Sequence, residues 1–540
     1  MNRLVRGLAG GLTLLAAGAA SAQQPAPLGD RPSEQDLFGG SAPAAAPPAA
    51  AAPAPAAASP ATTGPAPPAA PASPAAQPGE PAAAATQGTS RDQEVLGNSG
   101  ETKFLSEYVA PENPLQVGGQ LYLRAQSTAS AHQDPGDWSL SAPSLLDLYL
   151  DARPNPRVRG FVLGRMAFDP TKDPHSNMMT GSSQMMGSNG ALTGSGTPTG
   201  FSTFSSGRGP STLLDQMWIR FDILSKVFVT AGKQHVRFGT GRFWQPTDYL
   251  HPVKRNPLDV FDARPGETMV KLNIPWEEQG WNFYAFGITE DPNVATNTLG
   301  KVAGAARVEA VVAGVELGAD VYLHRGDRPR YGFDLSTGIW DFDVYGDLAL
   351  RPGGDFFHYD PDLNAVGVYT GYETQVVGGL NYSRKYNDND AWTAGFEYFY
   401  NHPGYSDASV YPKALQFAAN NLALLPDRNP FALFPFFYLG QHYGAVFVSF
   451  PAPYSWNYTT FTFSTLGNLS DKSFISRLDY SVTVLTHLSF EAFLGVHYGQ
   501  VGGEFRFQVS PDVASQLGVS AATLGSYPVV DLGAALRIKI

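Results

Sequence analysis

The sequence predicts an all-β protein: a transmembrane antiparallel β-barrel of about 16–18 strands, preceded by a disordered Pro/Ala-rich segment. Three observations support this prediction. An export signal opens the chain, residues 115–540 alternate apolar and polar residues in long runs, and only 16% of the 540 residues are charged. An average soluble protein carries about 25% charged residues, so this composition is unusual for a surface that faces water.

Composition also excludes several classes of protein. The chain has no cysteine, which excludes a disulfide framework, a thiolate metal site and a cysteine nucleophile. The net charge of −12 argues against a nucleic-acid partner, because proteins of that class present a basic surface to phosphate. The 57 glycines and 12% aromatic residues favour an unusual β protein over a cytosolic enzyme.

Residues 1–22 read as a secretory signal peptide. Arg3 and Arg6 supply a positive start, residues 8–19 are apolar and small, and Ala20-Ser21-Ala22 is a cleavage site of the A-x-A type. The alternative, an N-terminal membrane anchor, is weaker because the apolar core is too short to span about 30 Å of hydrocarbon. We therefore expect an exported protein without an inner-membrane helix.

Residues 23–90 are expected to form a disordered linker. Between residues 41 and 86 nearly every residue is Ala or Pro and Glu80 is the only charge, so there is little side chain to bury against the entropy of ordering. The linker is either a plain spacer or a periplasmic arm that presents Asp36-Leu37-Phe38-Gly39-Gly40 to a partner. Residues 91–114 are expected to be a periplasmic lead-in or a small plug.

Residues 115–540 show the period of two that is typical of β-strands. In the clearest run, residues 340–351, apolar side chains alternate with carboxylates, a tyrosine and an arginine. A barrel in a membrane turns the apolar face to lipid and the polar face to a water-filled lumen. The residues that we predict to face the lumen are Asp147, Asp151, Glu316, Asp320, Asp341, Asp343, Asp347, Arg477 and Asp479.

The lengths of the runs and of their connections favour a membrane barrel. Many runs have about 10–13 residues, whereas strands of soluble domains average about five or six and tilted membrane strands need about 9–11. Short turns at residues 153–156 and 224–226 alternate with long loops such as 169–212 and 403–433, the second of which includes a short helical stretch at 414–424. A soluble β-sandwich or propeller would show the same alternation, but its polar faces would carry many Lys and Glu residues.

Residues 230–275 form the most distinctive stretch. Strands expected at 227–236 and 268–274 flank a segment in which Gly239, Gly241, Phe243-Trp244 and Pro246-Thr247-Asp248 follow one another. This stretch resembles a segment of porin-like bacterial outer-membrane β-barrels. The resemblance implies an outer-membrane location. The final strand, apolar at every second position from residue 530, also resembles the assembly signal of such barrels, with Ile540 in place of the usual Phe.

The loop within this stretch is a candidate pore constriction. Opposed basic and acidic groups folded into a lumen would create a transverse field that selects polar or charged solutes. The candidate residues are Arg237, Arg242, Asp248, Lys254, Arg255, Asp259, Asp262 and Arg264. Under the alternative interpretation these charges pair locally and the loop only stiffens the rim of the barrel.

The predicted function is passive diffusion of small polar or charged solutes. The alternative is a plugged barrel with a structural or docking role, and a third hypothesis, an outer-membrane hydrolase, would need His251 and Asp248 to act together. The ten histidines form no trusted metal or catalytic motif, so we predict no enzyme, no catalytic residue, no metal and no cofactor. The expected partners are outer-membrane lipid and the barrel-assembly machinery, with a periplasmic partner of the arm and a homo-oligomer left open, and no nucleic acid.

Overall fold

The computed structural model describes residues 114–171, 210–251, 255, 257–258, 264, 266–289, 302–325, 328–354, 357–362, 364–387, 390–420, 438–454, 456–508, 510 and 526–540. The predicted signal peptide and linker, and all but the last residue of the lead-in, lie outside these residues. No helix within the described ranges is long and apolar enough to cross a membrane.

Long strands make up most of the described chain. Those of the first half are β1 (Leu115–Ser130), β3 (Ser144–Asn155), β4 (Val158–Phe168), β5 (Ser211–Ile223), β6 (Val227–Gln234), β7 (Glu267–Trp276), β8 (Trp281–Ile288), β9 (Ala303–Val312) and β10 (Val315–His324). Those of the second half are β11 (Arg330–Ile339), β12 (Phe342–Pro352), β15 (Tyr372–Lys385), β16 (Ala391–Asn401), β17 (His442–Pro451), β18 (Thr459–Asn468), β19 (Ser473–Leu485), β20 (Leu488–Gly499) and β21 (Pro528–Lys539).

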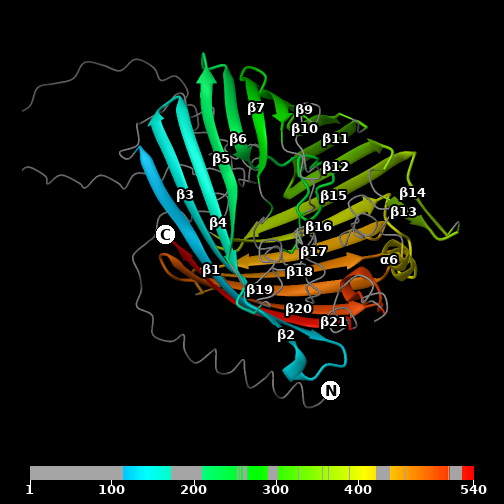
Figure 1. Ribbon diagram of the computed structural model, residues 1–540. Coiled ribbons are helices and arrows are strands. Elements are labelled where there is room, and N and C mark those ends of the chain that lie inside the picture. The colour runs from blue at the N-terminus through cyan, green and yellow to red at the C-terminus, as the bar shows by residue number, and fades with distance from the viewer. Residues whose placement is uncertain are drawn as a thin grey trace, which may run out of the picture. The chain divides into compact units, whose positions relative to one another are not determined.

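These strands close into a barrel (Figure 1). Within the described residues, 18 antiparallel strands pair in chain order, and β1 pairs with both β3 and β21. Gln120, for example, lies opposite Asp147 on one side and Lys539 on the other. Closure gives each strand two neighbours, which satisfies its backbone N–H and C=O groups without water. The predicted transmembrane barrel of 16–18 strands is confirmed.

The connections alternate between short turns at one rim and long loops at the other. Leu224 and Ser225, both with positive φ, form the tight turn expected between β5 and β6. The barrel also begins and ends at the short-turn rim, because Leu115 lies opposite Ala152 near the β3–β4 turn and Ile540 pairs with Gly119. In outer-membrane barrels the short turns face the periplasm.

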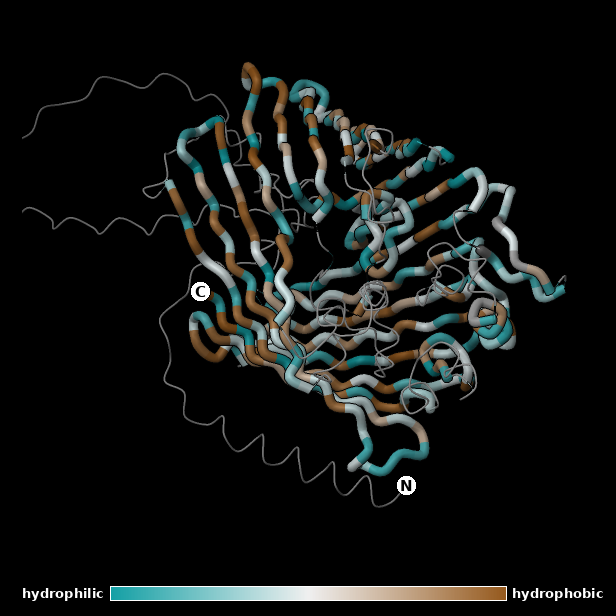
Figure 2. The backbone as a smooth tube through the Cα atoms, in the orientation of Figure 1, coloured by the Kyte–Doolittle hydropathy of each residue, from teal (hydrophilic) through white to brown (hydrophobic). Residues whose placement is uncertain are grey.

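The distribution of exposed side chains is the reverse of that in a soluble protein. Leu317 and Phe333 are 41% and 47% exposed on the outside, whereas Asp320 and Asp347 are 5% and 2% exposed on the inside. Figure 2 shows hydrophobic and hydrophilic residues alternating along the strands, as these exposures require. An apolar exterior needs lipid around it. The alternation therefore indicates a membrane barrel and not a β-sandwich with an apolar core.

Smaller elements belong to the long loops. β2 (Ser139–Ser141) continues the line of β3 along β1, and η1 (Pro135–Asp137) precedes it. The hairpin of β13 (Phe357–Asp360) and β14 (Ala365–Val368) follows β12, α6 (Val410–Asn420) follows β16, and η9 (Glu504–Arg506) follows β20. The helix expected from residue 414 thus begins earlier, at Val410, and residues 421–424 lie outside the described ranges.

Candidate functional site: a loop anchored inside the barrel

The described part of the β6–β7 loop (residues 235–251, 255, 257–258, 264 and 266) folds into the barrel, and two glycines make its sharp bend possible. Gly239 has a φ of +94°, and a Cβ there would lie 2.5 Å from both Asp347 Oδ2 and Thr247 Oγ1. A Cβ at Gly241 would lie 1.9 Å from the carbonyl oxygen of Trp244. The Gly-x-Gly pattern seen in the sequence is therefore a steric requirement of the bend.

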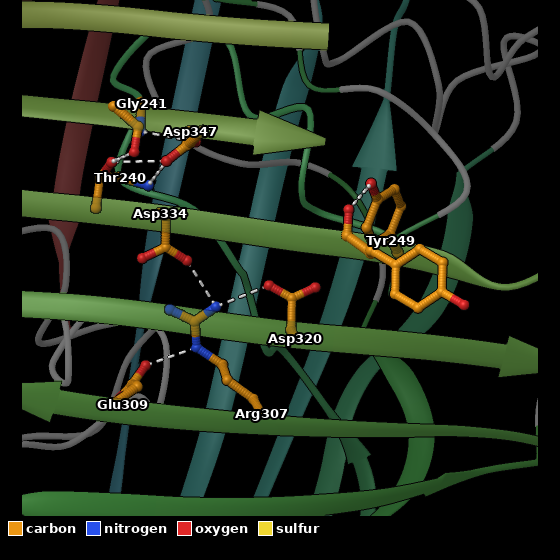
Figure 3. A network of polar contacts seen from close by, with 10 residues as sticks. Thr240, Gly241, Tyr249, Arg307, Glu309, Asp320, Asp334 and Asp347 are labelled. Atoms are coloured by element: carbon orange, nitrogen blue, oxygen red, sulfur yellow. Dashed lines mark hydrogen bonds and ion pairs between the residues drawn. The ribbon is translucent and has the colours of Figure 1, made fainter. Parts of the chain in front are cut away.

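Asp347 on β12 is the first wall residue that holds the loop. Thr240 donates to its carboxylate from the backbone nitrogen at 2.8 Å and from Oγ1 at 2.6 Å. Gly241 donates from its backbone nitrogen at 3.3 Å. Figure 3 shows these residues at the same wall as the acidic side chains of β9–β11. Asp347, which we predicted to face the lumen, thus lies at the inner surface and binds the loop.

Glu397 on β16 is the second such residue, and it is fully buried. The backbone nitrogens of Arg242, Phe243 and Trp244 donate to its carboxylate at 2.7, 3.0 and 2.9 Å. Tyr345 on β12 donates its hydroxyl to the same carboxylate at 2.9 Å. One carboxylate therefore holds three consecutive amides of the loop.

Apolar residues of the loop complete the attachment. Trp244 packs against Phe399 and Tyr443, with ring centroids 5.6 and 5.7 Å apart, and Phe243 packs against Phe447 at 6.0 Å. The inner-wall residues of this cluster are Val377, Phe399, Tyr443, Ala445, Phe447, Leu466 and Ile475. This patch belongs to β15–β19, on the far side of the barrel from the strands that carry the loop.

The beginning of the loop covers a buried charge network (Figure 3). Arg307 pairs with Glu309 at 2.7 Å, with Asp320 at 3.0 Å and with Asp334 at 2.8 Å. The ring of Phe238 lies 5.1 Å from its guanidinium carbon. A single arginine thus compensates three carboxylates of β9, β10 and β11 beneath the loop.

Asp248, His251 and Arg264 form a buried cluster within the loop. His251 Nδ1 lies 3.1 Å from an Asp248 oxygen, and Arg264 pairs with the other oxygen at 3.0 Å. Burial lowers the pKa of His251, which therefore remains neutral to a lower pH than usual. The cluster follows the local-pairing interpretation, and its burial gives the hydrolase hypothesis no accessible dyad.

Two other predicted constriction residues, Arg242 and Arg255, are less buried than this cluster. Arg242 is exposed, and its guanidinium carbon lies 3.7 Å from the centroid of Phe447. Arg255 is half-buried, and its carbonyl oxygen accepts a hydrogen bond from Tyr438 at 3.2 Å. In the described part of the chain, neither guanidinium forms an ion pair with a carboxylate. Arg237 is half-buried at the start of the loop, and the remaining candidates, Lys254, Asp259 and Asp262, lie outside the described residues.

A second segment, η9, also points inward. Glu504 accepts hydrogen bonds from the backbone nitrogens of Tyr438 and Leu439, at 3.1 and 3.2 Å, and from Asn468 at 2.9 Å and Tyr443. Its own backbone nitrogen donates to Asp471 at 2.7 Å. Beside it, Phe505 packs on the Trp244 cluster, so three loops meet over the same patch of wall.

Strands β20, β21, β1, β3 and β4 carry a different inner surface, which we call the ion-pair wall. Its pairs join neighbouring strands across the lumen face. They are Arg159–Asp151 at 2.9 Å, Arg165–Asp147 at 2.9 Å and Arg537–Glu491 at 2.8 Å. Charges of both signs therefore line this part of the inner surface.

The other predicted lumen residues fall into two groups. Arg477 and Asp479 pair at 2.6 Å on β19, and Glu316 is half-buried near the start of β10. Asp341 lies exposed in the β11–β12 turn, and Asp343 is exposed next to it at the short-turn rim.

Sequence reasoning missed several residues of this interior. Glu397 was missed because aromatic residues surround it and hide the alternation. Arg307 and Glu309 are two residues apart and share one face of β9. The period of two could therefore have identified both as inward-facing. The overlooked basic residues of the ion-pair wall are Arg124, Arg159, Arg165 and Arg537.

Comparisons with known proteins bear on the fold. No protein-family model matches the chain, and none of the curated proteins matches it. Among solved structures, it is similar to Acinetobacter baumannii OccAB1, with 10% identity over 79% of this chain and 96% of that chain and a TM-score of 0.45. It is also similar to OccAB3 of that organism (9% identity, 79% and 99% covered, TM-score 0.42) and to a triple mutant of the Rhodopseudomonas blastica porin (9%, 79% and 100%, 0.36).

The architecture is that of a membrane β-barrel. The sheet closes, the exterior is apolar, the interior carries the charges, and a loop is folded inside. The predicted barrel fold is confirmed, whereas the outer-membrane location stays a prediction.

Proposed function

We propose that the protein is an outer-membrane channel through which small polar or charged solutes diffuse passively, with the β6–β7 loop as its constriction. The observation that carries the proposal is that this loop is fixed to one part of the inner wall while the ion-pair wall lies elsewhere in the lumen. A solute passing between them meets the paired charges of the ion-pair wall rather than an apolar core. No catalytic group, metal or cofactor is part of this proposal.

Arg242 and Arg255 are the residues that we expect to set the selectivity. Among the described contacts neither guanidinium pairs with a carboxylate, whereas Arg264 is paired with Asp248. Positive charges at a constriction raise the local concentration of anions and lower that of cations. The proposal therefore includes a preference for anions.

Planar-bilayer recordings of the purified protein test this. In a salt gradient, changing Arg242 and Arg255 together to Gln is expected to shift the reversal potential toward that of a cation-selective pore. Arg157→Gln is the matched control, because Arg157 is exposed at the short-turn rim and should leave the reversal potential unchanged. An identical reversal potential in the double variant would reject the assignment, and absence of any steady current in the unmodified protein would favour a plugged, docking barrel.

The partners are part of the same proposal. Outer-membrane lipid surrounds the apolar exterior, and the final strand, β21, is proposed to be read by the barrel-assembly machinery. Residues 23–90 are proposed as a periplasmic arm, with or without a bound partner, and association into a homo-oligomer is compatible with the barrel.

A further inference from the structure

We infer that the carboxylate of Glu397 is the positioning group of the constriction: it fixes the loop backbone at residues 242–244 and thereby fixes where the Arg242 guanidinium stands in the passage. This inference rests on the proposed function for its effect on selectivity, although the attachment itself is independent of it. Glu397 touches no part of the passage, since its side chain is fully buried.

The hydrogen bonds around Glu397 suit an ionised carboxylate. One oxygen accepts from Arg242 N and Tyr345 Oη, and the other accepts from Phe243 N and Trp244 N. All four partners are donors, and a carboxylate offers about four acceptor positions, so the site is complete. A neutral side chain of the same shape cannot satisfy these four donors.

Three consecutive amides that point at one group are not satisfied by a strand or a helix. Such a run of N–H groups forms a concave site that requires an anion. Here the anion belongs to the wall, and its side chain is fully buried, away from water. Exclusion of water strengthens each hydrogen bond and raises the cost of leaving a donor unpaired. A residue of strand β16 therefore determines the position of the loop.

The consequence for selectivity follows from the chain geometry. The amide held most tightly, at 2.7 Å, belongs to Arg242 itself. Its side chain then extends over Phe447, where the ring face attracts the guanidinium. A fixed backbone and a ring beneath the charge leave the guanidinium little freedom. Asp347, by contrast, holds Thr240 and Gly241, which carry no charge.

Glu397→Gln is the decisive variant. Glutamine has one carbonyl oxygen and an NH2 group, so some of the four donors would face another donor. We expect the loss of the steady open level, replaced by rapid flicker, and a reversal potential shifted toward that of the Arg242→Gln variant. Glu491→Gln is the matched control. It removes the same charge from the inner wall, but Glu491 pairs with the side chains of Arg537 and Tyr122 instead of with loop amides. Removing a charge from the ion-pair wall also changes the reversal potential, so the comparison is made on the open level, which should stay steady.

A second readout does not depend on conductance. The chain has no cysteine, so Phe243→Cys introduces a single thiol at a position that is 6% exposed. In detergent solution this thiol should react slowly with a polar maleimide, and adding Glu397→Gln should accelerate the reaction while Glu491→Gln should not. Because labelling works even in a closed barrel, it separates failure of this inference from failure of the proposed channel function.

The conservative variants make the outcome unambiguous. Glu397→Asp keeps the charge but shortens the side chain, and Tyr345→Phe removes one of the four donors, so both should flicker less than Glu397→Gln. A folded, heat-modifiable Glu397→Gln barrel with the unmodified steady level and slow labelling would overturn the inference. Equal effects of Glu491→Gln would also overturn it. If Glu397→Gln does not assemble, unchanged current and labelling in both conservative variants would overturn it instead.

Discussion

The two inner walls of this barrel solve the problem of buried polarity differently. Beneath the loop, β15–β19 present an aromatic cluster and the carboxylate of Glu397, and on β9–β11 one arginine, Arg307, pairs with three carboxylates. On the ion-pair wall, several arginines and carboxylates share partners: Arg165 pairs with Asp147 and Asp215, and Asp151 pairs with Arg153 and Arg159. The charges of both walls are buried and therefore need partners, but the wall that receives the loop presents apolar surface and a few saturated charges where the ion-pair wall presents neighbouring arginines and carboxylates.

The contrast between the two walls shows what the residue types on the inner face of a barrel strand indicate. Outward positions are apolar everywhere, so they carry no information about the lumen. Inward positions that turn apolar, such as Tyr443, Ala445 and Phe447 on β17, indicate that another part of the chain docks there. The predictions that follow test whether the two walls respond to substitution as differently as their contacts imply.

The largest effect is expected at Arg307. Arg307→Met would leave Glu309, Asp320 and Asp334 buried without their shared cation, which should cost about 3–5 kcal/mol of unfolding free energy. On the ion-pair wall, Arg153→Met should cost less than about 1 kcal/mol, because the carboxylate of Asp151 keeps Arg159. Urea unfolding of the detergent-solubilised barrel measures both. Equal losses would contradict the distinction between the walls.

A smaller loss of overall stability, with a large local effect, is expected at Trp244. Trp244→Ala removes the ring that packs against Phe399 and Tyr443, which should weaken docking of the loop by about 3 kcal/mol. The strands do not depend on this contact, so the midpoint of barrel unfolding should hardly move while current noise rises. Trp340→Ala, in an exposed turn, is the control and should change neither.

The sequence was sufficient for the barrel because the period of two extends through long strands such as β10 and β12. It also singled out the loop that we propose as the constriction, since glycines, prolines and charges interrupt the strands there. It did not identify Glu397 as the anchor of that loop. The reason is physical: the partners of Glu397 are backbone amides, which every residue has, so no residue type at positions 242–244 indicates the bond. The contact between these loop amides and β16 joins residues that are far apart in the sequence, so it is seen only in the structure.

A pH effect is expected where η9 docks. Burial, with Asp471 nearby, raises the pKa of Glu504 to about 7 from 4.5, and burial also raises the pKa of Asp471. The docked state binds the proton more tightly than the released state, so docking is most stable below about pH 4.5 and weakens as the pH rises through 7. Tyr438, Asn468 and Tyr443 donate to Glu504 and no basic side chain does so among its described contacts, so nothing there reverses the sign.

Bilayer recordings across this range check the direction. Current noise should increase from about pH 5 to about pH 8, because the Glu504 carboxyl loses its proton while it is buried beside Asp471. Glu504→Gln cannot ionise and should show the same noise at both values. A rise in noise on acidification of the unmodified protein would have the wrong sign and would exclude Glu504 as the titrating group.

The smallest effect is expected at Asp341, which sequence reasoning grouped with Asp347 because both lie on the same side of one run. Asp341 is exposed in the β11–β12 turn at the short-turn rim, where water and salt screen its charge, so Asp341→Asn should leave conductance and reversal potential unchanged. Asp347→Asn weakens the attachment of Thr240 and Gly241 and should increase noise. A clear shift of selectivity in Asp341→Asn would mean that the short-turn rim, and not the anchored loop, controls passage.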